Sequence, residues 1–182
     1  MLQIIVPPIE NWDERKQEFV TIGSYQTLTL EHSLVSISKW ESKWCKAFLR
    51  ENNKTEEELL DYIKCMTITQ NVNPEVYDRL TPDNIEQVNS YINSPMTATT
   101  FSAEGKSGGR SNEVVTSELI YYWMVALNIP FKCEKWHINR LITLIKVCNI
   151  KNAPPKKRSK RELTSRNAAL NEARRKKYNT KG

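Results

Sequence analysis

Glu113 to Ile150 reads EVVTSELIYYWMVALN, IPFK and CEKWHINRLITLIKVCNI, the longest stretch dense enough in apolar residues to form a core. Apolar residues recur at helical spacing in its first part and predict a helix with one broad apolar face. Ser111 or Asn112 is expected to cap this helix, and Asn128 with Pro130 to end it. The second part predicts another helix, and the short linker favours an antiparallel pair. The two predicted faces comprise Val115, Leu119, Tyr122, Trp123, Ala126 and Leu127, and then Trp136, Ile138, Leu141, Ile142, Ile145 and Cys148.

The segments before this stretch predict further helices behind a small β element. Phe19–Ile22 and Tyr25–Leu30 flank Gly23-Ser24, which predicts a β-hairpin with a two-residue turn, and Ile4 to Val6 is a candidate third strand. Residues 33–50 switch to helical spacing. Further helices are expected at two start signals, which are Thr55 with Glu58 in a capping box and Thr81 before Pro82.

These patterns define a mainly α fold class with three parts. We expect an N-terminal β element over 1–32, a helical body over 33–152, and a basic tail over 153–182 that is partly disordered or helical. Residues 97–110 have no periodicity and three glycines, so they predict a mobile loop. In the tail, Ser159 and Glu162 have the spacing of a second capping box.

Charge is unevenly distributed along the 182 residues. Residues 151–182 contain 12 Lys/Arg and two Glu, a net charge of +10, whereas the remainder has 15 basic and 19 acidic residues, a net charge of −4. No apolar run approaches the roughly 20 residues that cross a bilayer, so no membrane partner is expected. The N-terminus lacks the features of a secretory signal, and the four cysteines lack a Cys-x-x-Cys spacing, which favours free thiols in a reducing cytoplasm.

Two motifs suggest a site and are better explained otherwise. Gly105-Lys106-Ser107 resembles a phosphate-binding loop, but Thr100 stands where that motif needs its first glycine. Cys133 and His137 have the spacing of two metal ligands on one helix, without two further ligands near them. We therefore expect no cofactor, no metal and no catalytic residue, and we interpret the chain as non-enzymatic.

Binding residues are expected on the aromatic helix faces and in the tail. Trp40, Trp44, Tyr121 and Trp136 are candidates for contacting a protein partner if one apolar face remains exposed, although packing in the core is the alternative for each. A dense basic tail is typical of nucleic-acid binding, and a solvated extension or a segment that folds on an acidic partner are the alternatives. The basic residues singled out in it are Lys156, Lys157, Arg158, Arg174, Arg175, Lys176 and Lys177.

Several blocks resemble the tail assembly chaperones of long-tailed bacteriophages. They are LEHSLVSISKWESKW, LDYIKCMTI, INSPMTATTF, ELIYYWMVALNIPFKCEKWHINRLITLIKVCN and LNEARRKK, spread over most of residues 30–177. The resemblance implies a largely helical, non-enzymatic protein of the host cell cytoplasm. It also implies binding to the phage tape measure protein, which such chaperones keep soluble, and recruitment of the tail-tube protein.

Two other functions remain open at this point. One is a structural component of the virion tail or its connector, and the other is an accessory protein that binds nucleic acid through the basic tail. The sequence leaves open whether the chain forms a homo-oligomer, and whether a longer frameshifted form exists.

Overall fold

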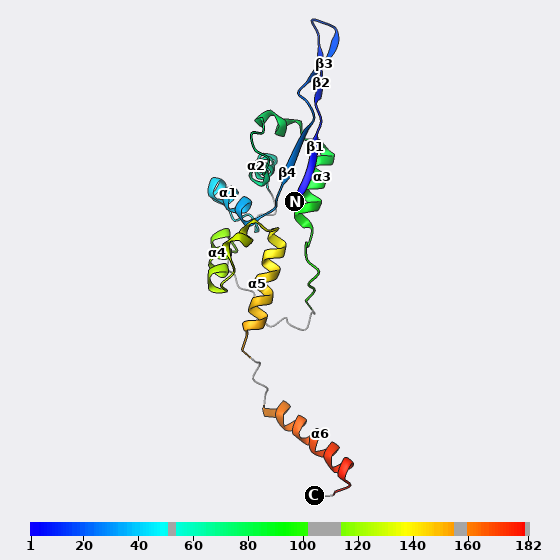
Figure 1. Ribbon diagram of the computed structural model, residues 1–182, viewed down its shortest axis with the longest axis vertical. Helices are drawn as coiled ribbons and strands as arrows, with labels where there is room; N and C mark the ends of the chain where they lie inside the picture. The colour runs from blue at the N-terminus through cyan, green and yellow to red at the C-terminus, as the bar shows by residue number, and fades with distance from the viewer. Residues whose placement is uncertain (51–53, 102–113, 155–159, 181–182) are drawn as a thin grey trace. The chain divides into compact units, whose positions relative to one another are not determined.

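A computed structural model describes residues 1–50, 54–101, 114–154 and 160–180 of the chain. The contacts within the chain divide it into two units, Met1–Asn149 and Ile150–Gly182. Helices dominate, so the mainly α prediction is confirmed, and antiparallel strand pairs occupy the N-terminal 30 residues (Figure 1).

The N-terminal strands form two antiparallel pairs in one continuous ribbon. β1 pairs with β4, and β2 pairs with β3 after Pro7-Pro8 interrupts the ladder, because proline has no N–H to donate. The predicted turn at Gly23-Ser24 is wrong, since these residues separate β3 from β4 while the chain reverses between Asp13 and Glu18. The candidate third strand belongs to β1. The bounds are β1 Leu2–Val6, β2 Ile9–Asp13, β3 Glu18–Ile22 and β4 Gln26–Leu30.

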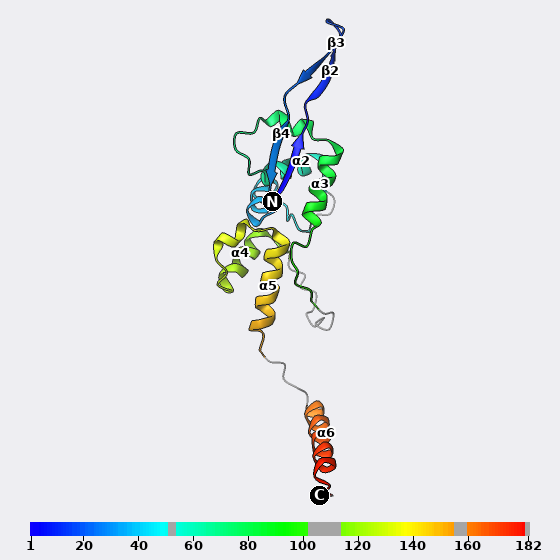
Figure 2. The same cartoon turned by 45° about the vertical axis from the view of Figure 1, so that its right-hand side comes forward.

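The β2–β3 pair, called the ribbon arm below (Ile9–Ile22), extends beyond the helices of its own unit. Figures 1 and 2 show it from two sides with no other helix or strand of this unit beside it. Arg79 holds its base, because its Nη1 donates to the carbonyls of Pro7 and Ser24 at 3.2 Å each. Gly23 lies against that guanidinium with φ +82°.

The helices of the first unit follow the strands. Buried Leu34, Ile37 and Trp40 confirm the predicted face of α1, although α1 ends earlier than predicted because Cys45 takes a left-handed conformation at φ 52°. The two predicted helix starts are confirmed, with Thr55 capping α2 and Thr81 capping α3. The bounds are α1 Leu34–Trp44, α2 Glu56–Met66, η1 Pro74–Arg79, α3 Pro82–Asn93, α4 Ser117–Ala126, η3 Phe131–Lys135 and α5 Ile138–Asn152.

The central stretch folds differently from its prediction in two respects. α4 begins at Ser117 with Thr116 as its cap, and it buries Ser117, Ile120 and Met124 instead of the predicted face. It is almost entirely apolar, so periodicity alone could not select its buried side. Residues 131–135 form the separate short helix η3, and α4 packs chiefly against α1, so the predicted antiparallel pair is not the main packing. The predicted end is confirmed, since Asn128 has φ 54°.

One hydrophobic core joins the β1–β4 pair to the helices of the first unit. Its fully buried side chains come from strands and helices alike, and they include Ile4, Leu28, Trp40, Tyr62, Ile120 and Leu141. The second unit contains α6 (Lys160–Tyr178), which agrees with the helical alternative for the tail. Ser111 and Asn112, the Gly105-Lys106-Ser107 motif, the Ser159 cap and most of the predicted 97–110 loop lie outside the described residues.

Candidate partner-binding surfaces

The two predicted tryptophans of α1 are held by hydrogen bonds against α2. Trp40 is fully buried and its Nε1 donates to the Glu58 carbonyl at 2.9 Å. Trp44 is half-buried, stacks on Trp40 with ring centroids 6.2 Å apart, and donates from Nε1 to Asp61 Oδ2 at 2.9 Å. Trp40 cannot reach a partner in this conformation, so it is removed from the candidates, whereas Trp44 keeps a partly exposed edge.

The other two predicted residues are half-buried near η3. Tyr121 donates to Glu134 Oε2 at 2.9 Å, and its burial, together with this hydrogen bond, raises the pKa of its hydroxyl to about 12. The guanidinium of Arg140 lies 4.3 Å from the ring centre of Trp136, a cation–π contact. Both side chains therefore have partners within the chain and show part of their rings to solvent.

A continuous apolar surface surrounds Tyr121. We call it the α4–η3 patch: Tyr121, Tyr122, Val125 and Phe131. Tyr122, Val125 and Phe131 are 65%, 59% and 57% exposed, and the rings of Tyr121 and Phe131 are 6.3 Å apart. Residues three and four apart on a helix are neighbours, which places Val125 beside both tyrosines. The sequence prediction had put Tyr122 in the core, so it missed the most exposed member of this patch.

The orientation of α4 is set by a buried carboxylate. Glu41 accepts a hydrogen bond from the Phe48 N–H at 2.8 Å on one oxygen and from the Ser117 N–H at 2.7 Å on the other. Ser117 is the first residue of α4, so the charge of Glu41 also meets the positive end of the helix dipole. Glu41 thereby fixes the start of the helix that carries the α4–η3 patch.

A second apolar surface covers the ribbon arm. Trp12 and Phe19 face each other across the strands at 5.0 Å between ring centroids and are 53% and 67% exposed. Ile9 and Ile22 form the other cross-strand apolar pair, and both are exposed. Side chains alternate between the faces of a strand, so the two pairs lie on opposite faces of the arm. The segment ENWDERKQEFVTI contains the two aromatic residues of this surface. Their pairing was not predicted, because the turn had been placed at Gly23-Ser24 instead of between Asp13 and Glu18.

A buried polar cluster lies where β4, α2, α3 and η3 meet. His32 hydrogen-bonds through Nδ1 to the Tyr62 hydroxyl, and its ring centroid is 5.0 Å from that of His137. His137 Nε2 contacts the Tyr91 carbonyl at 3.0 Å, and the Tyr91 hydroxyl donates to Glu31 at 2.6 Å. Burial, and then the charges of His137 and Lys54, lower the pKa of His32 to about 3, and burial also lowers the pKa of His137. Both histidine rings are therefore neutral at pH 7, and their hydrogen bonds connect the elements that meet in this cluster.

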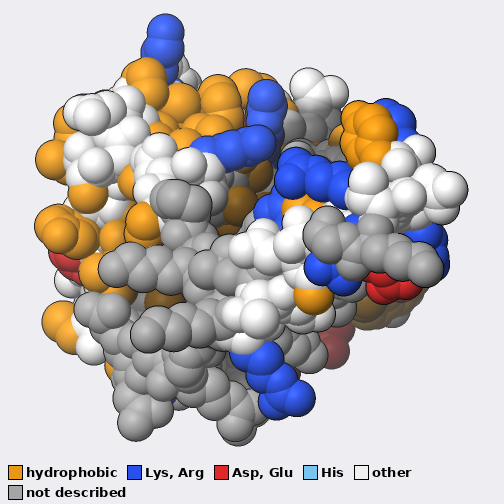
Figure 3. Space-filling model, turned by 90° about the horizontal axis from the view of Figure 1, so that it is seen from below, with side chains coloured by type: hydrophobic (Ala, Val, Ile, Leu, Met, Phe, Trp, Pro, Cys, Tyr) orange, Lys and Arg blue, Asp and Glu red, His pale blue; other side chains and the backbone are white. Residues whose placement is uncertain are grey.

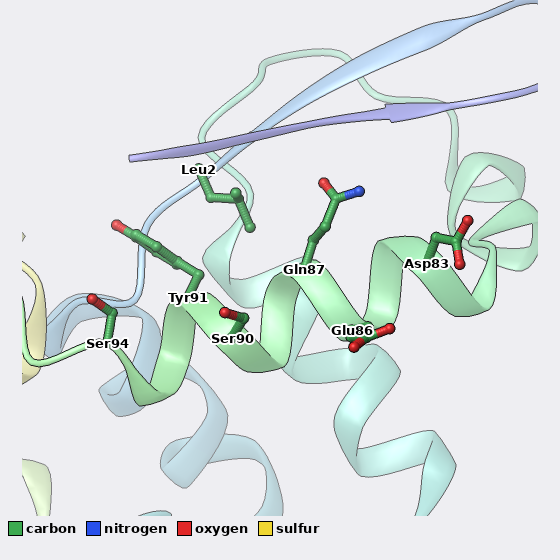
Figure 4. Close-up of a pocket in the computed structure, with 7 residues that line it drawn as sticks. All are labelled: Leu2, Asp83, Glu86, Gln87, Ser90, Tyr91 and Ser94. Carbon is green, nitrogen blue, oxygen red and sulfur yellow. The ribbon is translucent and has the colours of Figure 1, made fainter.

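An open pocket of about 650 Å³ lies between β1 and α3. Figure 4 shows Leu2 projecting from β1 towards α3, with Gln87 and Tyr91 projecting from α3 towards the strand. Asp83, Glu86, Ser90 and Ser94 complete the lining. Tyr91 belongs to the buried polar cluster, where burial and then its bond to Glu31 raise the pKa of its hydroxyl. The pocket is an open groove with both polar and apolar lining groups, and Tyr91 is the lining residue that it shares with the buried polar cluster.

The structure separates the two residues with metal-ligand spacing. Cys133 lies in η3, whereas His137 precedes α5 and faces His32 and Tyr91, so the prediction of a shared helix is wrong. Among the described residues, no group of three or more His, Cys, Asp or Glu side chains is placed to hold a metal ion.

The basic tail divides between described and undescribed residues. Arg174, Arg175, Lys176 and Lys177 lie on the last turns of α6 and are exposed, while residues 156–158 lie outside the described part of the chain. Figure 3 shows blue Lys and Arg side chains recurring over the face it presents, with red acidic side chains in smaller areas. In the parts of the chain that are described, no helix is long and apolar enough to cross a membrane.

No protein-family model matches the sequence, and neither curated proteins nor solved structures give a significant match.

Proposed function

We propose that this protein is a phage tail assembly chaperone that binds and solubilises the tape measure protein and assists assembly of the tail tube. The sequence blocks over residues 30–177 motivate this function through their resemblance to such chaperones. The observation that supports it most directly is the α4–η3 patch, where three large apolar side chains are more than half exposed. A contiguous exposed apolar surface on a protein is typical of a binding site for another chain.

The patch suits a helical partner. A tape measure protein has a long apolar stripe before the tube encloses it, and an apolar face accepts such a helix through contacts three and four residues apart. Many weakly bound copies along one rod then act together, because each bound copy adds to the avidity of the whole. Glu41 keeps the patch in a fixed orientation, which lowers the ordering cost of binding.

The test is co-expression with the tape measure protein of the same phage. Replacing Tyr122 and Val125 by serine removes exposed apolar surface, and we expect it to weaken binding by about tenfold or more, which corresponds to at least about 1.4 kcal/mol. Tyr25→Ser with Ile68→Ser is the matched control, because these residues are 73% and 49% exposed and lie outside the patch. An equal loss of binding in both double variants, or no loss of binding in either, would contradict the role of the α4–η3 patch.

The alternative function, a structural subunit of the virion tail or its connector, can be distinguished by the protein content of the virion. A chaperone leaves before the particle is complete, so mass spectrometry of purified virions should detect at most traces of this chain. Stoichiometric copies in finished particles would exclude the chaperone and favour a tail or connector subunit.

A further inference from the structure

The two edges of the ribbon arm differ in chemistry. Every strand of a two-stranded ribbon has one partner and one free edge, whose backbone groups can pair with another chain. β2 follows Pro7-Pro8 and carries Glu10 and Asp13, features that protect an edge. β3 reads EFVTI, with one charge at its end and no proline or lysine. The β3 edge is therefore the unprotected one.

Nothing in the described part of the chain covers the β3 edge. Outside the β2–β3 ladder, no hydrogen bond joins residues 18–22 to another described element. Phe19, Val20, Thr21 and Ile22 are all aromatic or β-branched, the residue types that favour strands. An isolated two-stranded hairpin is marginally stable in water, and added strands with an apolar face stabilise it. The arm has apolar pairs on both faces and lacks those added strands.

We propose that β3 pairs antiparallel with β3 of a second copy of this chain, forming a four-stranded sheet in the order β2, β3, β3, β2. A two-fold axis through Val20 places Phe19 opposite Thr21 of the other copy and Val20 opposite its counterpart. In this register the two Val20 side chains face each other across the new interface, on the face of the arm that carries the Ile9–Ile22 pair.

Charge supports a second copy as the occupant. In the register centred on Val20, each Glu18 faces Ile22 of the other copy and lies four residues along the strand from the other Glu18. Four residues span roughly 13 Å, at a rise of about 3.3 Å per residue. That separation exceeds the Debye length of about 8 Å at physiological ionic strength, so the two carboxylates scarcely repel. Pairing through β2 centred on Asn11 would instead place the two Glu10 carboxylates only two residues apart along the strand, which is roughly 7 Å.

Analytical ultracentrifugation of the full chain tests the proposal. We expect a dimer at micromolar concentration, and we expect Val20→Lys to weaken it about tenfold or more, because like charges directly opposite each other destabilise a strand pair. Asn11→Lys is the matched control, since Asn11 is the cross-strand neighbour of Val20 on the protected strand. It should leave the dimer intact, and circular dichroism should show that both variants fold.

A mixing experiment identifies the two-fold axis. Val20→Glu alone should also weaken the dimer, and an equal mixture with Val20→Lys should restore association, because opposite charges then face each other. A wild-type monomer at these concentrations would overturn the proposal. So would Asn11→Lys disrupting the dimer as strongly as Val20→Lys, or a mixture that fails to recover.

Discussion

Glu41 exemplifies a residue whose role depends on distant parts of the chain. Its carboxylate accepts the Phe48 N–H and the Ser117 N–H, which lie 7 and 76 residues away in sequence. Within the helical pattern of residues 33–50 it is one of several polar positions, so sequence alone could not single it out. A buried carboxylate is costly unless hydrogen-bonded, and these two bonds offset that cost while positioning α4.

The buried histidine pair makes a prediction about pH. His32 has a pKa of about 3 in the fold and an ordinary value near 6.5 when unfolded. Its pKa is lowered by folding, so its contribution is complete above pH 6.5 and is lost as the pH falls towards 3. We expect urea unfolding to show that His32 alone lowers the free energy of unfolding by about 2 kcal/mol between pH 7 and pH 5.

NMR supplies the control for this prediction, because carboxylates also titrate in acid. The ring signals of His32 should stay those of a neutral imidazole from pH 8 to pH 5. In His32→Gln, the loss of stability over the same range should become smaller. Titration of the His32 ring near its ordinary value would contradict the buried environment described above.

Elements with local signals could be predicted from the sequence, and those that depend on distant contacts could not. The capping box at Thr55 and the cap at Thr81 before Pro82 depend on residues within four positions, and both helix starts were predicted correctly. Strand pairing was not predicted correctly, because the partners in β1 and β4 lie 20 to 28 residues apart in the sequence. Gly23 had the local signature of a turn, yet its left-handed conformation serves the base of the ribbon arm.

The base of the ribbon arm should depend on Gly23. An added Cβ would lie 2.4 Å from Arg79 Nη1, and a φ of +82° disfavours any L side chain. We expect Gly23→Ala to lower the free energy of unfolding by about 1–2 kcal/mol, measured by urea denaturation. Ser24→Ala is the control, because Ser24 contributes its backbone carbonyl to Arg79. An unchanged midpoint in Gly23→Ala would mean that the arm tolerates the substitution by moving freely.

At the scale of the whole molecule, the sequence makes the distribution of charge visible and leaves the exposure of apolar residues undetermined. The basic tail stood out in the sequence, and the structure assigns residues from Ile150 to a second unit containing α6. The α4–η3 patch did not stand out, since Tyr122 and Trp123 look equivalent in a nearly all-apolar helix, and only tertiary packing exposes the first more than the second. The exposure of the side chains in the α4–η3 patch could therefore not be predicted from the sequence.

Removing the tail separates the chaperone from the nucleic-acid alternative. A chain ending at residue 155 loses 11 of the 27 Lys and Arg residues, while Leu170 and Tyr178 in the removed part are exposed, so the melting temperature should scarcely change. Apolar contacts by residues 30–150 should still bind the tape measure protein at high salt, because screening shortens to about 3 Å at 1 M and weakens mainly exposed charge pairs. Nucleic-acid binding by the full chain would instead fall steeply with salt, with a slope of about −0.9 per neutralised phosphate of duplex DNA.

A pull-down across a salt series with both chain lengths measures the difference. Partner binding lost on truncation, together with tight and salt-sensitive DNA binding by the full chain, would show that the tail carries the principal function.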